Sequence, residues 1–156
     1  MSVVIRTEID IDAPPRTVWS ILVDLKRYPD WNPFTVQMTS SLKMGAPVAM
    51  RVALRKGWRI RQTEYVSAHE SERKLCWKMK GLPPFVLGAE RCQALQPLAG
   101  GQTRYVNADV FRGVLSPLLM WIFGKDIERG FEQVARALKR RAETDRARAT
   151  PDRSTR

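Results

Sequence analysis

Alternating apolar and polar residues recur along most of the chain, and this pattern constrains the fold more than any other feature. In residues 3–12, the odd positions are apolar or Thr and most even positions are charged. A period of two is typical of a strand with one buried face. The pattern returns between turn signals such as KMGAP, RKG and PLAGGQ. The predicted strands span residues 3–12, 34–42, 48–55, 58–66, 74–80, 85–95 and 103–111. Because short turns join successive strands, we expect a seven-stranded antiparallel sheet with one apolar face.

Two stretches carry apolar residues at helical spacing instead. Val18, Ile21 and Leu22 follow Pro15, and proline suits the first turn of a helix because its missing N–H would have no partner there. Residues 115–138 continue this spacing, which predicts a long helix. The order of elements favours an α+β fold. A curved sheet would wrap around the C-terminal helix, and two short helices after the first strand would close one end.

Composition excludes several classes of protein. At 156 residues and 44% hydrophobic, one domain with one sizeable core is expected. Cys76 and Cys92 lie in predicted strands without metal-binding spacing, so we expect two buried, reduced thiols. The N-terminus lacks the basic start and apolar block of a signal peptide. Residues 114–124, the longest nearly uncharged apolar stretch, are too short to span a bilayer. These features predict a soluble cytoplasmic protein.

The net charge of +11 is spread along the chain. Residues 139–156 contain almost no apolar residue larger than Ala, so residues 144–156 are predicted to form a basic, disordered tail. The remaining excess of positive charge lies along the predicted strands, for example at Arg51, Arg55, Arg59 and Arg61. Because no basic helix with interleaved aromatic residues is present, a solvated surface is favoured over a nucleic-acid partner.

Candidates for chemistry are few. The single histidine, His69, falls in the predicted turn SAHESER, where a solvated side chain is expected. No nucleophile elbow, phosphate loop or metal-ligand cluster is present, so neither a metal nor a cofactor is expected. Acid–base candidates are therefore carboxylates on an inward strand face. Glu64 is one, since it shares a face with Trp58, Ile60 and Gln62.

For the last two predicted strands, the alternation does not decide which face points inward. On the final strand, one face holds the bulkier residues Tyr105, Asn107, Asp109 and Phe111. That bulk favours this face as the inward one. Glu90 and Arg91 lie on opposite faces of the preceding strand, so one of them should point in. A buried carboxylate needs a partner, and Arg91 with Asp109 or Glu64 would supply one. Such a pair can hold a ligand hydroxyl or carbonyl, or it can be structural.

The opening IDIDAPPRTVWSILVDLKRYPDWNPF, and the ending GGQTRYVNADVFRG before an amphipathic helix, resemble the START-like (SRPBCC) superfamily. This grouping covers Bet v 1-type proteins, lipid-transfer START domains and bacterial polyketide cyclase/dehydrase-like proteins, and the chain is closest to the small bacterial members. The resemblance covers residues 2 to about 143. It implies a helix-grip domain over residues 1–143, with a cavity between the sheet and the long helix. It does not imply one activity, since members bind lipids, hormones or polyketides, and some are cyclases, hydrolases or chaperone cofactors.

The resemblance also suggests a place for the aromatic segment YPDWNPF. In a helix-grip fold this segment lies beside the open end of the sheet, so Trp31 and Phe34 can turn inward as a wall or lid. Asp30 and Asn32 can accept hydrogen bonds from backbone N–H groups of the turn. For Trp31, a core plug that seals the end of the sheet is an equal alternative. The predicted ligand-binding residues are Trp31, Phe34, Met50, Trp58, Ile60, Gln62, Glu64, Trp77, Met79, Arg91, Tyr105, Asn107, Asp109, Phe111, Leu119, Phe123 and Ile127.

Three functions remain open. The leading one is non-enzymatic binding of a small hydrophobic molecule, such as a lipid, an isoprenoid or an aromatic polyketide. The second is an enzyme of the polyketide cyclase/dehydrase type, or one like a hydrolase, with Glu64 or Asp109 as acid or base. The third is a basic interaction module for RNA, the ribosome or a membrane surface. A monomer or a homodimer fits each of them.

Overall fold

The computed structural model describes residues 2–150, and over this range seven strands form one antiparallel sheet. The strands are β1 (Ser2–Ile11), β2 (Thr35–Thr39), β3 (Pro47–Arg55), β4 (Trp58–Glu70), β5 (Lys74–Lys78), β6 (Gly88–Leu98) and β7 (Gln102–Arg112). Their order in the sheet is β1-β7-β6-β5-β4-β3-β2. Neighbours from β2 to β7 are hairpin partners along the chain, and β1 pairs with the last strand. The predicted seven-stranded antiparallel sheet is confirmed.

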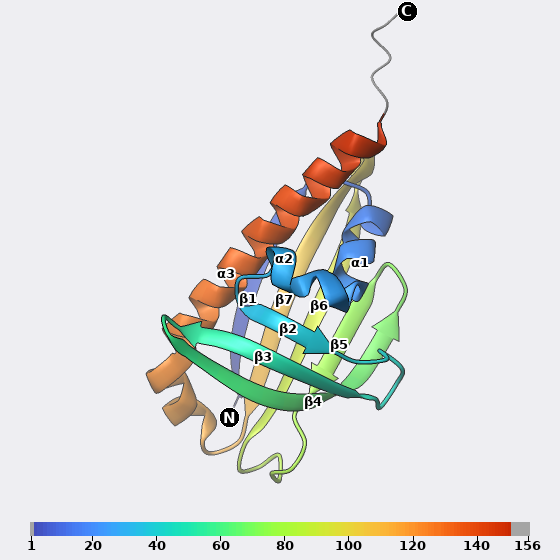
Figure 1. Ribbon diagram of the computed structural model, residues 1–156. Coiled ribbons are helices and arrows are strands. Elements are labelled where there is room, and N and C mark those ends of the chain that lie inside the picture. Colours follow the sequence, from blue (N-terminus) through green and yellow to red (C-terminus); the bar gives the residue numbers. More distant parts are fainter. Residues whose placement is uncertain (1, 151–156) are drawn as a thin grey trace, which may run out of the picture.

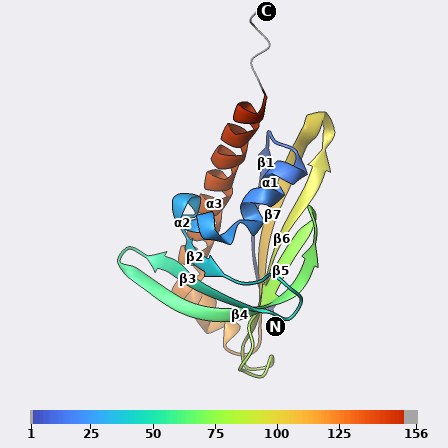
Figure 2. The same ribbon diagram turned by 45° about the vertical axis from the view of Figure 1, so that its right-hand side comes forward.

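The helices are placed so that the long one crosses the sheet. They are α1 (Pro15–Val23), η1 (Leu25–Arg27), α2 (Tyr28–Trp31), η2 (Ala99–Gly101) and α3 (Ser116–Ala149). Figures 1 and 2 show the sheet curving around α3, with α1 and α2 beside the helix at one end. This arrangement confirms the α+β helix-grip fold. No helix within residues 2–150 combines the length and the apolar character needed to cross a bilayer.

Proline sets the start of each α-helix. Pro15, Pro29 and Pro117 all lie within the first two positions of their helices, where the absent N–H costs no hydrogen bond. The sequence predicted two short helices after the first strand, with the segment YPDWNPF as a loop after them. The chain leaves helical geometry at Asp24 (φ −82°, ψ 73°) and re-enters it as η1 and α2, so the first four residues of that segment are helical.

The two halves of α3 pack differently against the rest of the molecule. Residues of the C-terminal half, such as Val134 and Leu138, are fully buried. Gly130 shows how close this approach is, because a Cβ atom there would lie 2.2 Å from Cδ2 of Phe34. In the N-terminal half, large residues such as Phe123 are only half-buried. The helix therefore packs tightly at one end and leaves space under the other.

The C-terminal part of α3 is longer than predicted. The helix continues to Ala149, and Arg146 forms an ion pair with Asp12. Glu143 also accepts a hydrogen bond from the backbone N–H of Asp12, at 3.0 Å. Residues 144–149 are thus helical, and Arg146 links them to the end of β1, contrary to the predicted disorder. The rest of the predicted tail, residues 151–156, lies outside the described residues.

The two cysteines form a disulfide, so the prediction of two reduced thiols is wrong. Cys76 on β5 lies directly opposite Cys92 on β6, with Cα atoms 4.2 Å apart. The alternation placed each residue in a strand but carried no information about which strands are neighbours or in what register. Disulfides are typical of oxidising compartments, so this bond gives no support to the predicted cytoplasmic location. That location stays a prediction.

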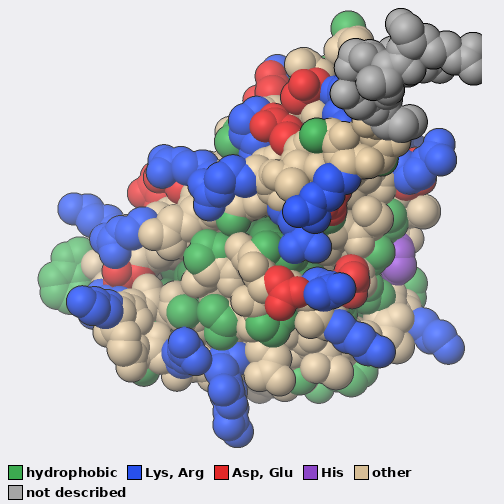
Figure 3. All heavy atoms as spheres, turned by 45° about the horizontal axis from the view of Figure 1, so that its top comes forward, with side chains coloured by type: hydrophobic (Ala, Val, Ile, Leu, Met, Phe, Trp, Pro, Cys, Tyr) green, Lys and Arg blue, Asp and Glu red, His purple; other side chains and the backbone are tan. Residues whose placement is uncertain are grey.

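Basic side chains are spread over the surface, as Figure 3 shows for one face, with acidic side chains among them. Some of them hold elements together. The guanidinium of Arg55, at the end of β3, donates to Asp126 Oδ2 at 2.6 Å and to the carbonyl oxygen of Ile122 at 2.7 Å. This contact ties the β3–β4 hairpin to α3.

Candidate functional site

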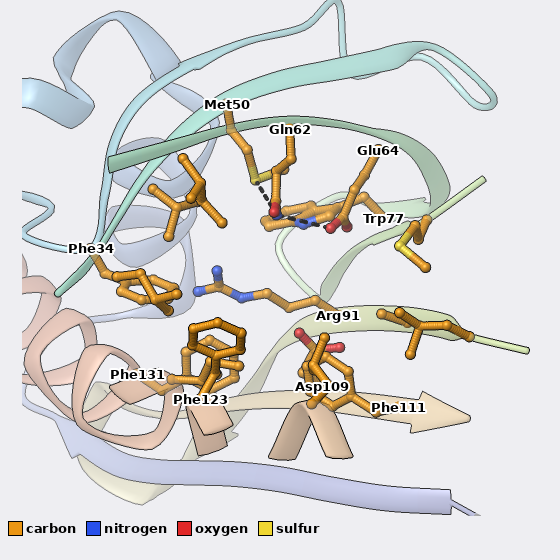
Figure 4. A pocket seen from close by; sticks show the side chains of 18 of the residues that line it. Phe34, Met50, Gln62, Glu64, Trp77, Arg91, Asp109, Phe111, Phe123 and Phe131 are labelled. Atoms are coloured by element: carbon orange, nitrogen blue, oxygen red, sulfur yellow. Dashed lines mark hydrogen bonds between the residues drawn. The ribbon is translucent and has the colours of Figure 1, made fainter. Parts of the chain in front are cut away.

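A cavity of about 300 Å³ lies between the inner face of the sheet and the N-terminal half of α3. Figure 4 shows side chains from several strands and from the helix converging on it. Most predicted site residues line it, namely Phe34, Met50, Trp58, Ile60, Gln62, Glu64, Trp77, Met79, Arg91, Asp109, Phe111, Leu119, Phe123 and Ile127. Their role in binding stays a prediction.

Three predicted residues lie outside the cavity. Tyr105 and Asn107 are fully buried on the inward face of β7, so the choice of that face was right. They lie, however, in the tightly packed part of the core, where the Tyr105 hydroxyl donates to Gln93 Oε1 at 2.6 Å. Trp31 packs edge-on against Tyr28, with ring centroids 5.2 Å apart, and joins the margin of the core. This placement agrees with the core-plug alternative for Trp31.

Sequence reasoning missed five lining residues, which are Val52, Leu54, Leu87, Ala89 and Phe131. All five carried a usable signal. Val52 and Leu54 share the apolar alternation of Met50, Ala89 shares a face with Arg91, and Phe131 belongs to the apolar stripe of α3. Leu87 also falls on the Arg91 face of the predicted strand 85–95, although in the structure it lies just before β6.

Phe34 reaches the cavity because Asn32 shapes the turn before it. The Asn32 side-chain oxygen accepts hydrogen bonds from the backbone N–H groups of Phe34 (3.0 Å) and Thr35 (2.8 Å), as predicted for an Asn in a turn. Asp30, predicted to act likewise, pairs with Arg27 at 3.1 Å instead. The Phe34 ring then packs edge-on against another cavity aromatic, Phe131.

Arg91 is the charged residue of β6 that points inward, and it is only 5% exposed. It lies opposite Asp109 in the β6–β7 register, yet Figure 4 shows its guanidinium extending away from that carboxylate toward Phe34 and Phe131. Its Nε donates to Asn107 Oδ1 at 3.0 Å, and its Cζ lies 4.4 Å from the Phe131 ring centroid.

The predicted ion pair of Arg91 with a cavity carboxylate is therefore wrong. Within residues 2–150, the salt bridges of the protein do not include Arg91. Neighbouring strands are only about 4.8 Å apart, and an extended Arg side chain is longer than that gap. The guanidinium accordingly passes the carboxylate and lies over aromatic rings, where cation–π attraction stabilises it.

Two carboxyl groups in the cavity have unusual ionisation. Burial, assisted by the charge of Asp109, raises the pKa of Glu64 to about 8. Burial also raises the pKa of Asp109 to about 6, against the opposing attraction of Arg91. At pH 7 Glu64 is thus mostly protonated, while Asp109 is mostly ionised. Gln62 donates to Glu64 Oε1 at 3.0 Å, whereas Asp109 Oδ1 is buried with no hydrogen-bond partner among the described residues.

His69 is not part of this site. It lies in β4, which continues to Glu70, and its ring Nδ1 is 2.8 Å from the carbonyl oxygen of Leu42. Its ring also packs against Trp19, with centroids 5.5 Å apart. The predicted turn is instead the end of β4, because the strand runs past the apparent turn signal, but the side chain is exposed to solvent as expected. The side chain supports local structure at a distance from the cavity lining.

Exposure along the lining shows where the cavity opens. At one end, Trp77 and Phe131 are each 1% exposed. At the other, Trp58 is 45% exposed, and Leu87 and Leu119 are half-buried. The mouth thus lies between the β3–β4 hairpin, the loop before β6 and the first turns of α3.

Comparisons with known proteins agree with this geometry. A family model described as "Polyketide cyclase / dehydrase and lipid transport" matches residues 2–143. No curated protein matches the chain in sequence.

Solved structures with a similar fold include the ZhuI aromatase/cyclase from Streptomyces sp. R1128. It has a TM-score of 0.75 at 17% identity, covering 99% of this chain and 100% of that one. A START superfamily protein from Mycobacterium smegmatis has a TM-score of 0.69 at 20% identity, with 90% and 97% covered. A norcoclaurine synthase mutant from Thalictrum flavum has a TM-score of 0.70 at 13% identity, with 94% and 97% covered. At these identities the likeness shows the fold alone.

Proposed function

Because the chain belongs to the polyketide cyclase/dehydrase and lipid-transport family, we propose that its cavity binds a small, mostly apolar molecule bearing a hydroxyl or carbonyl group. The membership confirms the resemblance seen in the sequence. One observation carries the proposal: an apolar chamber under α3 that contains a protonated carboxyl, an ionised carboxylate and a buried guanidinium. A chamber with few polar groups among apolar walls is the usual form of a small-molecule site.

The volume limits the size of the occupant. A cavity of about 150 Å³ holds benzene, so a cavity of about 300 Å³ suits a compound of roughly two fused rings. Among the candidates predicted from the sequence, this favours an aromatic compound over a long-chain lipid. The planar guanidinium of Arg91, already lying over Phe131, offers a further stacking surface for such a ring.

The polar groups offer complementary contacts to the occupant. Protonated Glu64 can donate to a carbonyl oxygen, and the unpartnered Oδ1 of Asp109 can accept from a hydroxyl. Burying roughly 250 Å² of apolar ligand surface contributes about 6 kcal/mol, and association costs several of these. We therefore expect high-micromolar affinity or weaker from the apolar walls, and about fivefold tighter binding with one satisfied polar group.

Naphthalene and 2-naphthol test this proposal, since they differ by one hydroxyl. Binding is followed by quenching of tryptophan fluorescence, and we expect both to saturate, with 2-naphthol the tighter. Ala89→Phe narrows the cavity and should abolish binding of both, whereas Ala49→Phe on the opposite, exposed face of β3 should not. If the Ala89→Phe variant still binds 2-naphthol, the binding site lies outside the cavity and the proposal is refuted.

A second candidate function is acid–base catalysis on such a compound. The observation that favours it is the pair of carboxyls whose pKa values, about 8 and about 6, lie on either side of neutrality in one chamber. In the dehydration of a β-hydroxy ketone, Asp109 would take the proton α to the carbonyl. Glu64 would protonate the departing hydroxyl, which leaves as water.

The probe for this candidate is 4-hydroxy-4-phenylbutan-2-one, whose dehydration to the conjugated enone is followed by ultraviolet absorbance. We expect the rate to fall below pH 6, as Asp109 becomes protonated, and above pH 8, as Glu64 ionises. Asp109→Asn and Glu64→Gln should each reduce the rate to that of buffer. If both variants retain the rate of the wild type, these carboxyls are not catalytic. The basic interaction module stays a prediction, as does the oligomeric state.

A further inference from the structure

Exposed apolar side chains gather at the end of the molecule where the cavity opens. Trp121 is 83% exposed and Phe85 is 72% exposed. Together with their neighbours they form a surface that we call the apolar end, which consists of Leu82, Phe85, Val114, Leu115, Leu118, Trp121 and Ile122. It holds most of the large hydrophobic residues that are exposed within residues 2–150. Large contiguous apolar patches of this kind mark interaction sites.

The apolar end is one continuous surface, although it comes from two segments. The backbone N–H of Val114 donates to the carbonyl oxygen of Phe85 at 2.9 Å, and that of Leu115 donates to Val86 at 3.0 Å. Phe85, Val114 and Pro117 also line one surface groove. Figures 1 and 2 both show the loop before β6 beside the start of α3, at the opposite end of the molecule from the end of that helix.

The first turns of α3 are apolar on two opposite sides. Leu119 and Phe123 point into the cavity. Leu118, Trp121 and Ile122, at spacings of three and four residues, form a stripe on the exposed side. A helix that is apolar all round is normally buried. The exposed stripe therefore indicates that this side of the helix contacts an apolar partner when the protein functions.

Charge identifies the kind of partner. The segments 78–88 and 112–125 contain four basic residues and no Asp or Glu, the basic residues being Lys78, Lys80, Arg112 and Lys125. Figure 3 shows hydrophobic side chains protruding at the left edge, on the side where α3 begins, with Lys and Arg near them. A two-fold dimer through this end would place these like charges against their own copies, whereas an anionic lipid surface would attract them.

We propose that the apolar end docks on an anionic lipid bilayer as a peripheral contact. Trp and Phe side chains suit the boundary between headgroups and acyl chains, and Lys and Arg extend to the lipid phosphates. Because the cavity mouth is bounded by the same two segments, an apolar ligand could pass between membrane and cavity with little exposure to water. The docking itself does not require an occupied cavity.

Vesicle flotation tests the docking. The full chain is mixed with vesicles of phosphatidylcholine alone, or of phosphatidylcholine with phosphatidylglycerol, at low and high salt. We expect flotation with the anionic vesicles only, weakened by salt. The double variant Phe85→Ser, Trp121→Ser should bind roughly tenfold or more weakly. Met44→Ser is the control, since Met44 is 65% exposed and lies in the β2–β3 connection; it should bind like the wild type.

Each contrary outcome overturns the proposal in a distinct way. If the wild type does not float with anionic vesicles, bilayer docking is excluded. If the double variant floats as well as the wild type, the bilayer is held by another basic surface. Sedimentation velocity without vesicles tests the remaining alternative, which is self-association. If the wild type is a dimer and the double variant is a monomer, the apolar end is a dimer interface. The replaced side chains are solvent-exposed, and far-UV circular dichroism verifies that the variants fold.

Discussion

Replacing Glu64 by Gln should stabilise the protein at high pH, because this carboxyl becomes difficult to ionise when the chain folds. Burial in the cavity raises its pKa from 4.5 to about 8. A Gln side chain has nearly the same shape and can accept the same hydrogen bond from Gln62. The substitution therefore removes the ionisation while leaving the packing nearly unchanged.

The sign follows from proton binding. Between pH 4.5 and about 8, the folded state keeps the Glu64 proton and the unfolded state releases it, so stability falls as pH rises through this window. Below the window both states are protonated, and above it the folded state carries a buried charge. The full shift corresponds to about 5 kcal/mol at 1.4 kcal/mol per unit. Because Glu64 is not fully buried, solvent screens part of this cost, and we expect about 3 kcal/mol to be measured.

Urea unfolding at pH 5 and pH 9 measures this difference. The Glu64→Gln variant should exceed the free energy of unfolding of the wild type by less than about 1 kcal/mol at pH 5 and by about 3 kcal/mol at pH 9. Glu70→Gln is the matched control, since Glu70 is exposed on the same strand. Its effect should stay within about 0.5 kcal/mol at both pH values. If Glu64→Gln has equal effects at pH 5 and pH 9, the carboxyl is not held in a desolvated chamber and the reasoning fails.

Two further predictions concern the packing of α3 and the disulfide. Gly130→Ala forces the Phe34 ring to move and should cost about 2 kcal/mol in urea unfolding. Gly124→Ala meets only ordinary contacts and should gain about 0.5–1 kcal/mol; equal gains for both would show that the ring lies elsewhere. Protein purified without reductant and then unfolded should show no free thiol for Cys76 or Cys92, and Cys76→Ser should cost about 3 kcal/mol. Two titratable thiols before reduction would contradict the bond.

Local periodicity was enough to predict which side of each element is buried. The alternation of β5 placed Trp77 inward, the bulk on β7 did the same for Tyr105, and both are at most 1% exposed. Alternation reports on the burial of each strand independently of its neighbours, because successive strand side chains point to opposite faces wherever the strand lies. The same holds for the helical stripe that predicted α3. The seven-stranded sheet, its long helix and most of the cavity lining follow from such local patterns.

What the sequence left undetermined depends on distances between elements. The pairing of Cys76 with Cys92 requires the β5–β6 register, and the direction of Arg91 depends on the ring of Phe131 from another element. The cavity itself exists because α3 touches Phe34 closely at Gly130 and stands away from the sheet nearer its start. The size of a cavity depends on the relative positions of side chains that are far apart in the sequence, and no local pattern encodes those positions. The sequence by itself determined which face of each strand and helix is buried, and the tertiary structure alone decided the cavity between those faces.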